Sequence, residues 1–263
     1  MIPYKYLPFR YFLPFIPLIL LIIVFKDAIS IQFFFNPHAP DLQGLDGMAI
    51  QRQFFINSLK LQNTLFEYGF YQSLFFPITI VFSGYLYSRI KKDHLKHFIG
   101  RNQYYTRRLR ESKFYFTGLI VFTFLFVLVI ITIVAILTGQ SAISQLEPYF
   151  DSHSFLSFFS SRTYLYMIYY TSIKCVALIT NSLFFYHLID YFGSYIKSSL
   201  LYLIFMWALS PLLYAFLPYY LPPMSSIMIT AYGGVTFPHV LLSYTFYAVA
   251  YLYMRVRKPY EVT

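Results

Sequence analysis

A dense basic cluster lies between two uncharged apolar runs in this chain. Residues 89–113 contain nine Lys and Arg against two acids, Asp93 and Glu111. The flanking segments 70–87 and 114–137 carry no charge, and each is close to the roughly 20 residues that a helix needs to cross a bilayer. Because short loops rich in Lys and Arg remain cytoplasmic, the pattern predicts an integral membrane protein with loop 88–113 on the cytoplasmic side.

Composition agrees with this class. The chain has 263 residues, of which 58% are hydrophobic and 11% are charged, and its mean hydropathy is +0.57; a soluble domain is about a quarter charged. The net charge of +10 does not indicate a nucleic-acid partner, because the basic residues flank apolar runs, as membrane topology requires. The single cysteine, Cys175, excludes an internal disulfide and a cysteine-based zinc site.

The apolar runs predict an all-α polytopic protein with one transmembrane domain of six helices. The predicted spans are 11–25, 70–87, 114–137, 164–189, 199–217 and 238–254. The external loops are then 36–68, 139–161 and 218–237. The first contains an amphipathic stretch at 50–66 that we expect to lie along the outer membrane surface. The third contains three prolines and two glycines, which predict a broken external segment or a re-entrant hairpin.

Six spans place both termini in the cytoplasm. With that topology fifteen Lys and Arg lie inside, four lie outside and Lys174 falls within the bilayer. The inverted topology would reverse the bias, so the distribution favours internal termini. We expect a multi-pass protein of a bacterial plasma membrane, in contact with membrane lipid.

Signatures of catalysis and of cofactor binding are absent from the sequence. There is no nucleophile elbow, zinc-protease motif or Walker A phosphate loop, so the chain cannot hydrolyse ATP by the P-loop mechanism. His94 and His97 share a helix face, but their basic surroundings would repel a metal cation. We therefore expect no catalytic residue, no metal and no directly bound cofactor.

Lys174 is the most unusual single residue, because a charge near the centre of a membrane helix costs roughly 2.5–3.5 kcal/mol on insertion scales. It should face the interior of the bundle, with Asn181 one helix face away. Two interpretations remain open. Lys174 and Asn181 can belong to a transport pathway or an interface, or Lys174 can be a structural lysine whose charge is met by carbonyl groups or carried towards the surface along the helix.

The basic loop has three interpretations: topogenic charge, binding of anionic lipid headgroups, and docking of a cytosolic partner. Its first half, 88–99, predicts an amphipathic helix that Gly100 can end. The apolar residues of that helix are Ile90, Leu95, Phe98 and Ile99. A purely topogenic loop needs no apolar face, whereas a helix that docks in a partner's groove does. The pattern therefore favours docking.

The sequence 90–113 resembles the cytoplasmic coupling loop of permease subunits of type-2 ABC exporters. Asp93 takes the early acidic position, Arg101 lies in the following basic and aromatic stretch, and Lys113 is the closing lysine. The resemblance implies that a cytosolic P-loop ATPase docks on 90–99 and supplies ATP hydrolysis, and that a second permease chain, identical or different, completes the pathway. It also implies export of an amphiphilic cargo such as a peptide, a drug or a lipid-linked molecule.

A rival from another class is a membrane protein that does not transport and acts by binding, such as an immunity or sensor-associated subunit. An enzyme is the least supported class, because no acid–base pair and no nucleophile with a base can be recognised. The apolar face of the basic loop favours transport over binding.

Overall fold

A computed structural model describes residues 15–42, 44, 46–93, 102–140, 155–159, 162–228 and 235–257. These ranges are helical and contain no β-strand. The α-helices are α1 (Phe15–Val24), α2 (Lys26–Phe34), α3 (Gly47–Ser58), α4 (Leu61–Asp93), α5 (Asn102–Leu137), α6 (Thr163–Phe192), α7 (Tyr195–Leu203), α8 (Ser210–Tyr214), α9 (Ser225–Met228), α10 (Phe237–Leu242) and α11 (Thr245–Arg257). Two short 3₁₀ turns, η2 (Pro40–Leu42) and η5 (Phe155–Phe159), and one π-helical segment, η6 (Ile204–Leu209), complete the elements.

Four helices of the described chain are long and apolar enough to cross a membrane: α4, α5 from Tyr104, α6, and the continuous run Tyr195–Tyr214. A fifth is added if α1 and α2, which meet at a bend of 61°, are one broken span. This agrees with the predicted helical membrane protein. The predicted sixth span, 238–254, is divided between α10 and α11, and the 13 residues of α11 are too few to span a bilayer at 1.5 Å per residue.

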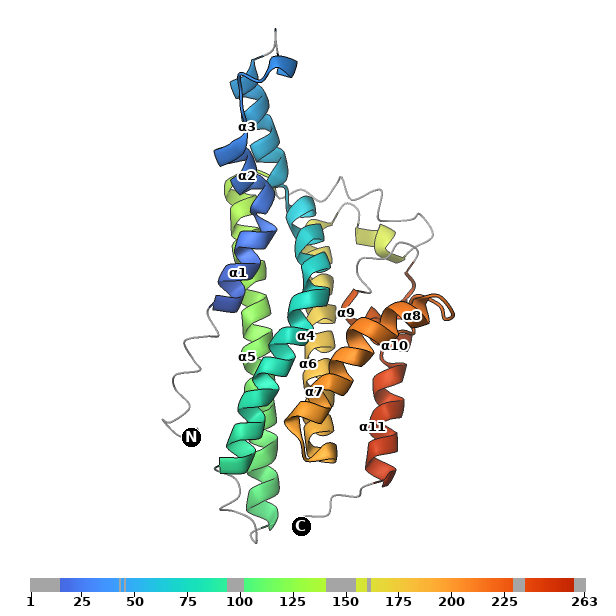
Figure 1. The fold of residues 1–263 in the computed structure, drawn as a ribbon. Helices are drawn as coiled ribbons and strands as arrows, with labels where there is room; N and C mark the ends of the chain where they lie inside the picture. The colour runs from blue at the N-terminus through green and yellow to red at the C-terminus, as the bar shows by residue number, and fades with distance from the viewer. Residues whose placement is uncertain are drawn as a thin grey trace.

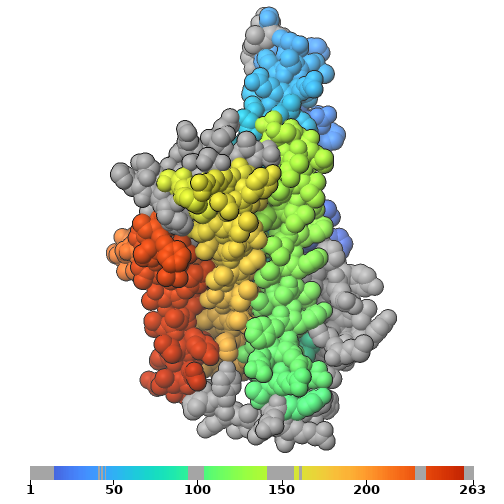
Figure 2. All heavy atoms as spheres, turned by 180° about the vertical axis from the view of Figure 1, so that it is seen from behind, coloured from blue at the N-terminus to red at the C-terminus, as the bar shows by residue number. Residues whose placement is uncertain are grey.

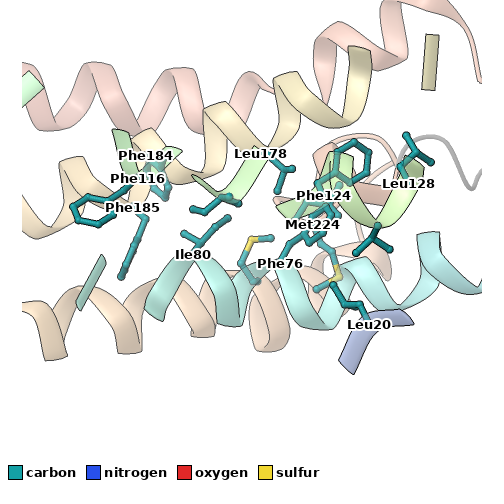
Figure 3. Packing of buried hydrophobic residues seen from close by; sticks show 14 of the residues in the cluster. Leu20, Phe76, Ile80, Phe116, Phe124, Leu128, Leu178, Phe184, Phe185 and Met224 are labelled. Carbon is teal, nitrogen blue, oxygen red and sulfur yellow. The ribbon is translucent and has the colours of Figure 1, made fainter. Parts of the chain in front are cut away.

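The helices α4, α5 and α6 form the centre of the molecule, and α1 packs on one side of them while α7 and α11 pack on the other (Figure 1). Seen from behind, α5, α6 and α11 run side by side (Figure 2). Aromatic side chains fill the space between α4 and α5, where Phe76 and Phe124 meet edge to face at 5.9 Å and belong to the same buried cluster as Phe185 of α6 (Figure 3).

The spans are longer than the sequence predicted at the end of the bundle where α4 ends and α5 begins, which we call the basic end. The helix α4 continues to Asp93 and α5 starts at Asn102, so only 94–101 lie between the two helices, outside the described residues. Lys and Arg are good helix formers, and charged residues extend a helix beyond the apolar layer at little cost. The predicted loop 88–113 is therefore largely the ends of two long helices.

The amphipathic stretch 50–66 is divided between two helices, and its position at the membrane surface stays a prediction. Its first part is α3, which packs against α2 and projects beyond the other helices along the axis of the bundle (Figure 1). Residues from Leu61 onwards already belong to α4. Asp46 caps α3 by accepting hydrogen bonds from the backbone N–H groups of Met48 and Ala49 at 3.1 Å, and the Gln51 side chain donates to the Ile31 carbonyl at 3.0 Å. The helix α3 therefore has α2 as its packing partner.

The proline-rich segment after α8 turns back into the bundle. Its short helix α9 contacts α4 and α6, and Ser225, Ser226 and Ile227 are fully buried. The described part of 218–237 is thus a broken segment whose short helix lies inside the bundle, and its placement on the external side of the membrane stays a prediction. We refer to 218–228 as the returning segment.

Candidate functional site

Two groups of polar side chains gather around α6, one near its C-terminal end and one halfway along it. The first, at the basic end, consists of Asp190 with Tyr87, Lys91, Lys113 and His187, and we call it the Asp190 cluster. The second, halfway along α6, consists of Lys174 and Asn181 with Tyr202, Ser226 and Tyr247, and we call it the central cluster. Both lie in a bundle that is otherwise packed with apolar and aromatic side chains.

The Asp190 carboxylate binds two lysines from two other helices. Its Oδ1 lies 2.7 Å from Lys91 Nζ near the end of α4, and its Oδ2 lies 2.5 Å from Lys113 Nζ on α5. The Tyr87 hydroxyl donates to the same carboxylate at 2.9 and 3.0 Å. All four side-chain contacts are short and charge-assisted, which makes them stronger than neutral hydrogen bonds.

Burial makes these ion pairs different from those on the surface. The side chains of Lys113 and Asp190 are 8% and 11% exposed, so water screens them little. The carboxylate holds two ammonium groups, and His187 Nδ1 lies 3.4 Å from Lys113 Nζ. Removing one partner of such a buried pair is strongly destabilising, because the remaining charge is left uncompensated.

Sequence reasoning identified Lys113, as the closing lysine of the loop, but missed Asp190. The sequence placed Asp190 at the start of a short internal turn, 190–197, with no role. One signal was available: it is an acid at the cytoplasmic end of a predicted span, opposite a loop that holds nine basic residues. Its partners could not be chosen from those nine without the packing of α6 against α4 and α5.

Asn181 is the centre of the second cluster and is fully buried. Its Oδ1 accepts hydrogen bonds from Tyr247 at 2.7 Å and Tyr202 at 3.3 Å. Its Nδ2 donates to the Ala177 carbonyl at 2.8 Å and to Ser226 Oγ at 3.1 Å. All four hydrogen bonds that an amide side chain can form are therefore made, and they join α6 to α7, α9 and α11.

Lys174 lies on the same helix, two turns away, and is 1% exposed. Its ammonium donates to the backbone carbonyl of Ile227 in α9 and lies 5.4 Å from the centre of the Tyr170 ring. No Asp or Glu of the described residues forms an ion pair with it. The predicted inward orientation of Lys174 and Asn181 is thus observed, and the two side chains share one partner, the returning segment.

Further side chains hold the returning segment from α8 and α11. The backbone N–H of Met224 donates to Ser210 Oγ at 3.0 Å, and the Tyr247 hydroxyl lies 2.7 Å from the Pro223 carbonyl. The Tyr214 hydroxyl lies 3.0 Å from Ser225 Oγ. A segment with three prolines cannot form a long helix of its own, so side chains of its neighbours satisfy its backbone.

The predicted docking residues are only partly described. Ile90 is 2% exposed, so it packs into the bundle and is not part of an exposed apolar face. Asp93 is the last residue of α4. Leu95, Phe98, Ile99 and Arg101 lie outside the described residues, so the docking of a partner on them stays a prediction.

The site contains no arrangement that indicates metal chemistry: among the residues that the structure describes, no three His, Cys, Asp or Glu are grouped to hold a metal ion. The fold and the two clusters define the class as a helical membrane protein with paired and unpaired charges in its interior. Comparisons with protein-family models, curated proteins and solved structures give no match.

Proposed function

We propose that this chain is the permease subunit of an ATP-driven exporter of a bacterial plasma membrane, with both termini in the cytoplasm and six spans, of which the sixth is formed by α10 and α11 together. A separate P-loop ATPase docks on 90–99 of the basic loop, and a second permease chain completes the pathway. The cargo is amphiphilic. One observation carries this proposal: a single carboxylate, Asp190, is bound to a lysine on each of the two helices that flank the basic loop.

The Asp190 cluster gives the basic loop a mechanical connection to the interior. A force on the loop acts on the ends of α4 and α5, and the two ion pairs transmit it to α6, which also carries the central cluster. Packed interfaces change between discrete arrangements rather than deforming smoothly. Nucleotide-driven closure of the ATPase would therefore select one of two arrangements of α6 and the returning segment.

Purification of the tagged protein in mild detergent, with mass spectrometry of the proteins that copurify, tests this proposal. We expect a P-loop ATPase with the wild type and its loss from the Leu95→Asp/Phe98→Asp double variant. The matched control is Phe33→Asp/Phe34→Asp, the same chemical change on the highly exposed end of α2, which should retain the ATPase. Absence of an ATPase from the wild type, or equal retention by both variants, would contradict the proposal.

A second candidate function is binding without transport, as in an immunity or sensor-associated subunit. The observation that favours it is the projecting pair α2 and α3, which exposes Phe33, Phe34, Met48 and Phe54 by 76%, 82%, 63% and 51%. If this pair captures an external ligand, the Phe33→Asp/Phe34→Asp variant would lose that ligand while the Leu95→Asp/Phe98→Asp variant would retain it.

A further inference from the structure

Lys174 and Lys113 are both buried lysines on the central helices, but they differ in the groups that surround their ammonium charges. Lys113 is 6% exposed and has the Asp190 carboxylate at 2.5 Å. Lys174 is 1% exposed, and its contacts within the described residues are one carbonyl oxygen and one ring face. A carbonyl and a ring compensate a buried ammonium only in part. The Lys174 position therefore has an unmet preference for negative charge.

An aromatic ring that carries a hydroxyl group lies beside Lys174. Tyr170 lies one turn before it on α6, and its hydroxyl accepts a hydrogen bond from Gln72 Nε2 of α4 at 3.3 Å. The Tyr170 proton remains available to a ligand. Gln72 is fully buried, and its Oε1 has no hydrogen-bond partner in the described part of the chain. An unsatisfied buried amide oxygen is uncommon in a folded protein, but it is a hydrogen-bond acceptor and would repel an anion, so Gln72 contributes to this place only by holding the Tyr170 hydroxyl.

The oxygen that Lys174 now contacts belongs to the least regular part of the bundle. Ile227 lies in the four-residue helix α9, which side chains of α6, α8 and α11 hold in place. No long backbone ladder fixes it. The Ile227 carbonyl therefore occupies the place beside the ammonium that an anionic oxygen would take, and it can be displaced by the loss of a few side-chain hydrogen bonds.

We propose that Lys174 and Tyr170, the latter held by Gln72, form a recognition site for an anionic headgroup of an amphiphile, a carboxylate or a phosphate, which replaces the Ile227 carbonyl at the Lys174 ammonium. This inference rests on the proposed export function and specifies the chemistry of its cargo. The carboxylate or phosphate neutralises Lys174, and the apolar tail of the amphiphile lies among the aromatic side chains between α4 and α6. Displacement of α9 couples occupancy of the site to the position of the returning segment.

The single tryptophan of the chain reports on this site. Trp207 Nε1 donates to the Ser73 carbonyl at 3.3 Å, and Ser73 is the next residue after Gln72. The protein is placed in neutral phosphatidylcholine nanodiscs with a tryptophan-free scaffold protein, without any ATPase. Its fluorescence is then titrated with dodecanoate, dodecyl phosphate and, as the neutral control, dodecanol.

We expect a saturable change with at least one anion and none with dodecanol. Half-saturation should weaken at least about tenfold in Lys174→Met, because a charge-assisted hydrogen bond contributes about that factor, and Lys174→Arg should retain most of the affinity. The control Lys197→Met removes an exposed positive charge on α7 and should leave binding unchanged. Preference for dodecanoate indicates a cargo with a carboxylate, and preference for dodecyl phosphate indicates a lipid-linked phosphate.

Three results would overturn the inference: no saturable response of the wild type to either anion, an equal response to dodecanol, or equal affinity in Lys174→Met. Equal thermal midpoints of the variants in the absence of amphiphile verify that they fold. Because the titration contains no ATPase, its failure would leave the copurification result intact, and failure of copurification would leave the binding result intact.

Discussion

The two buried lysines of the bundle illustrate two ways of placing a charge in an apolar interior. Lys113 at the basic end is matched by a carboxylate that also binds Lys91 and Tyr87. Lys174 in the middle of α6 contacts no carboxylate among the described residues and donates instead to a backbone carbonyl of the returning segment. The first arrangement fixes three helices to one another, because the carboxylate of α6 contacts an ammonium group from each of α4 and α5. The second leaves a charge that a ligand can satisfy better than the protein does.

The largest expected effect on stability comes from removing the charge of Asp190, which pairs with Lys113. Asp190→Asn should lower the free energy of unfolding by about 3–5 kcal/mol, because Lys113 is left buried without its counter-charge. Unfolding by dodecyl sulfate from mild detergent measures this change. Glu111→Gln is the control, since Glu111 pairs with Arg107 and Arg108 on an exposed face and such pairs contribute little. Equal stability of Asp190→Asn and the wild type would show that the Asp190 cluster does not hold the helices together.

Removing the Asn181 amide from the central cluster should have the next largest effect on stability. Asn181→Ala removes the partner of Tyr247, Tyr202 and Ser226, and we expect a loss of about 1–3 kcal/mol from buried groups left without hydrogen bonds. Asn63→Ala, at an exposed side chain that donates to the Asn57 carbonyl, should cost less than half as much. If both variants unfold alike, the returning segment is not anchored through Asn181.

Gly84 of α4 lies against α6, so substitutions there test how closely the two helices pack. A methyl group at Gly84 would lie 2.1 Å from Cε1 of the buried Phe185 ring, so Gly84→Ala should destabilise the protein by about 1–3 kcal/mol through overpacking. On α5, a methyl group at Gly118 would have no atom within 4 Å, and Gly118→Ala should be neutral or stabilising by up to about 1 kcal/mol. Thermal midpoints that move in the same direction for both would contradict this packing.

The unmatched charge should have the smallest effect on stability. Lys174→Met removes a buried charge and one hydrogen bond to α9, and these contributions oppose each other, so the free energy of unfolding should stay within about 1 kcal/mol of the wild type. Comparison with Asp190→Asn in the same detergent makes the contrast quantitative. A loss as large as that of Asp190→Asn would mean that Lys174 is a structural residue, which is the other interpretation that the sequence left open.

The sequence predicted well what depends on local composition. The helices α4 and α5 follow from uncharged apolar runs, α6 follows from an apolar run whose only charged residue is Lys174, and the prolines at 218, 222 and 223 predicted a break. It did not predict where the broken segment goes, because its burial depends on Lys174, Asn181 and Tyr247, which are far away in the chain. Nor did it predict the last helix as two pieces, since α10 and α11 have the same apolar composition as a continuous span.

The same holds for the site: residues that stand out in local composition were predicted, and residues whose role comes from packing were not. Lys174 and Asn181 were identified because a charge and an amide are conspicuous in an apolar run. Asp190 was missed, although it pairs with Lys91 at a separation of 99 residues, because its role comes from the packing of three helices. The apolar face predicted for 90–99 is reduced by the burial of Ile90, since α4 continues further than hydropathy alone indicates.

A double-mutant cycle between Asp190 and Lys113 is the most direct test of the central claim, which is that one carboxylate joins α4 and α5 at the basic end to α6. The stabilities of the wild type, Asp190→Asn, Lys113→Met and the double variant are measured by the same unfolding titration. We predict a coupling energy of at least about 1.5 kcal/mol, with the double variant more stable than Asp190→Asn alone. Additive effects, within about 0.5 kcal/mol, would contradict the claim.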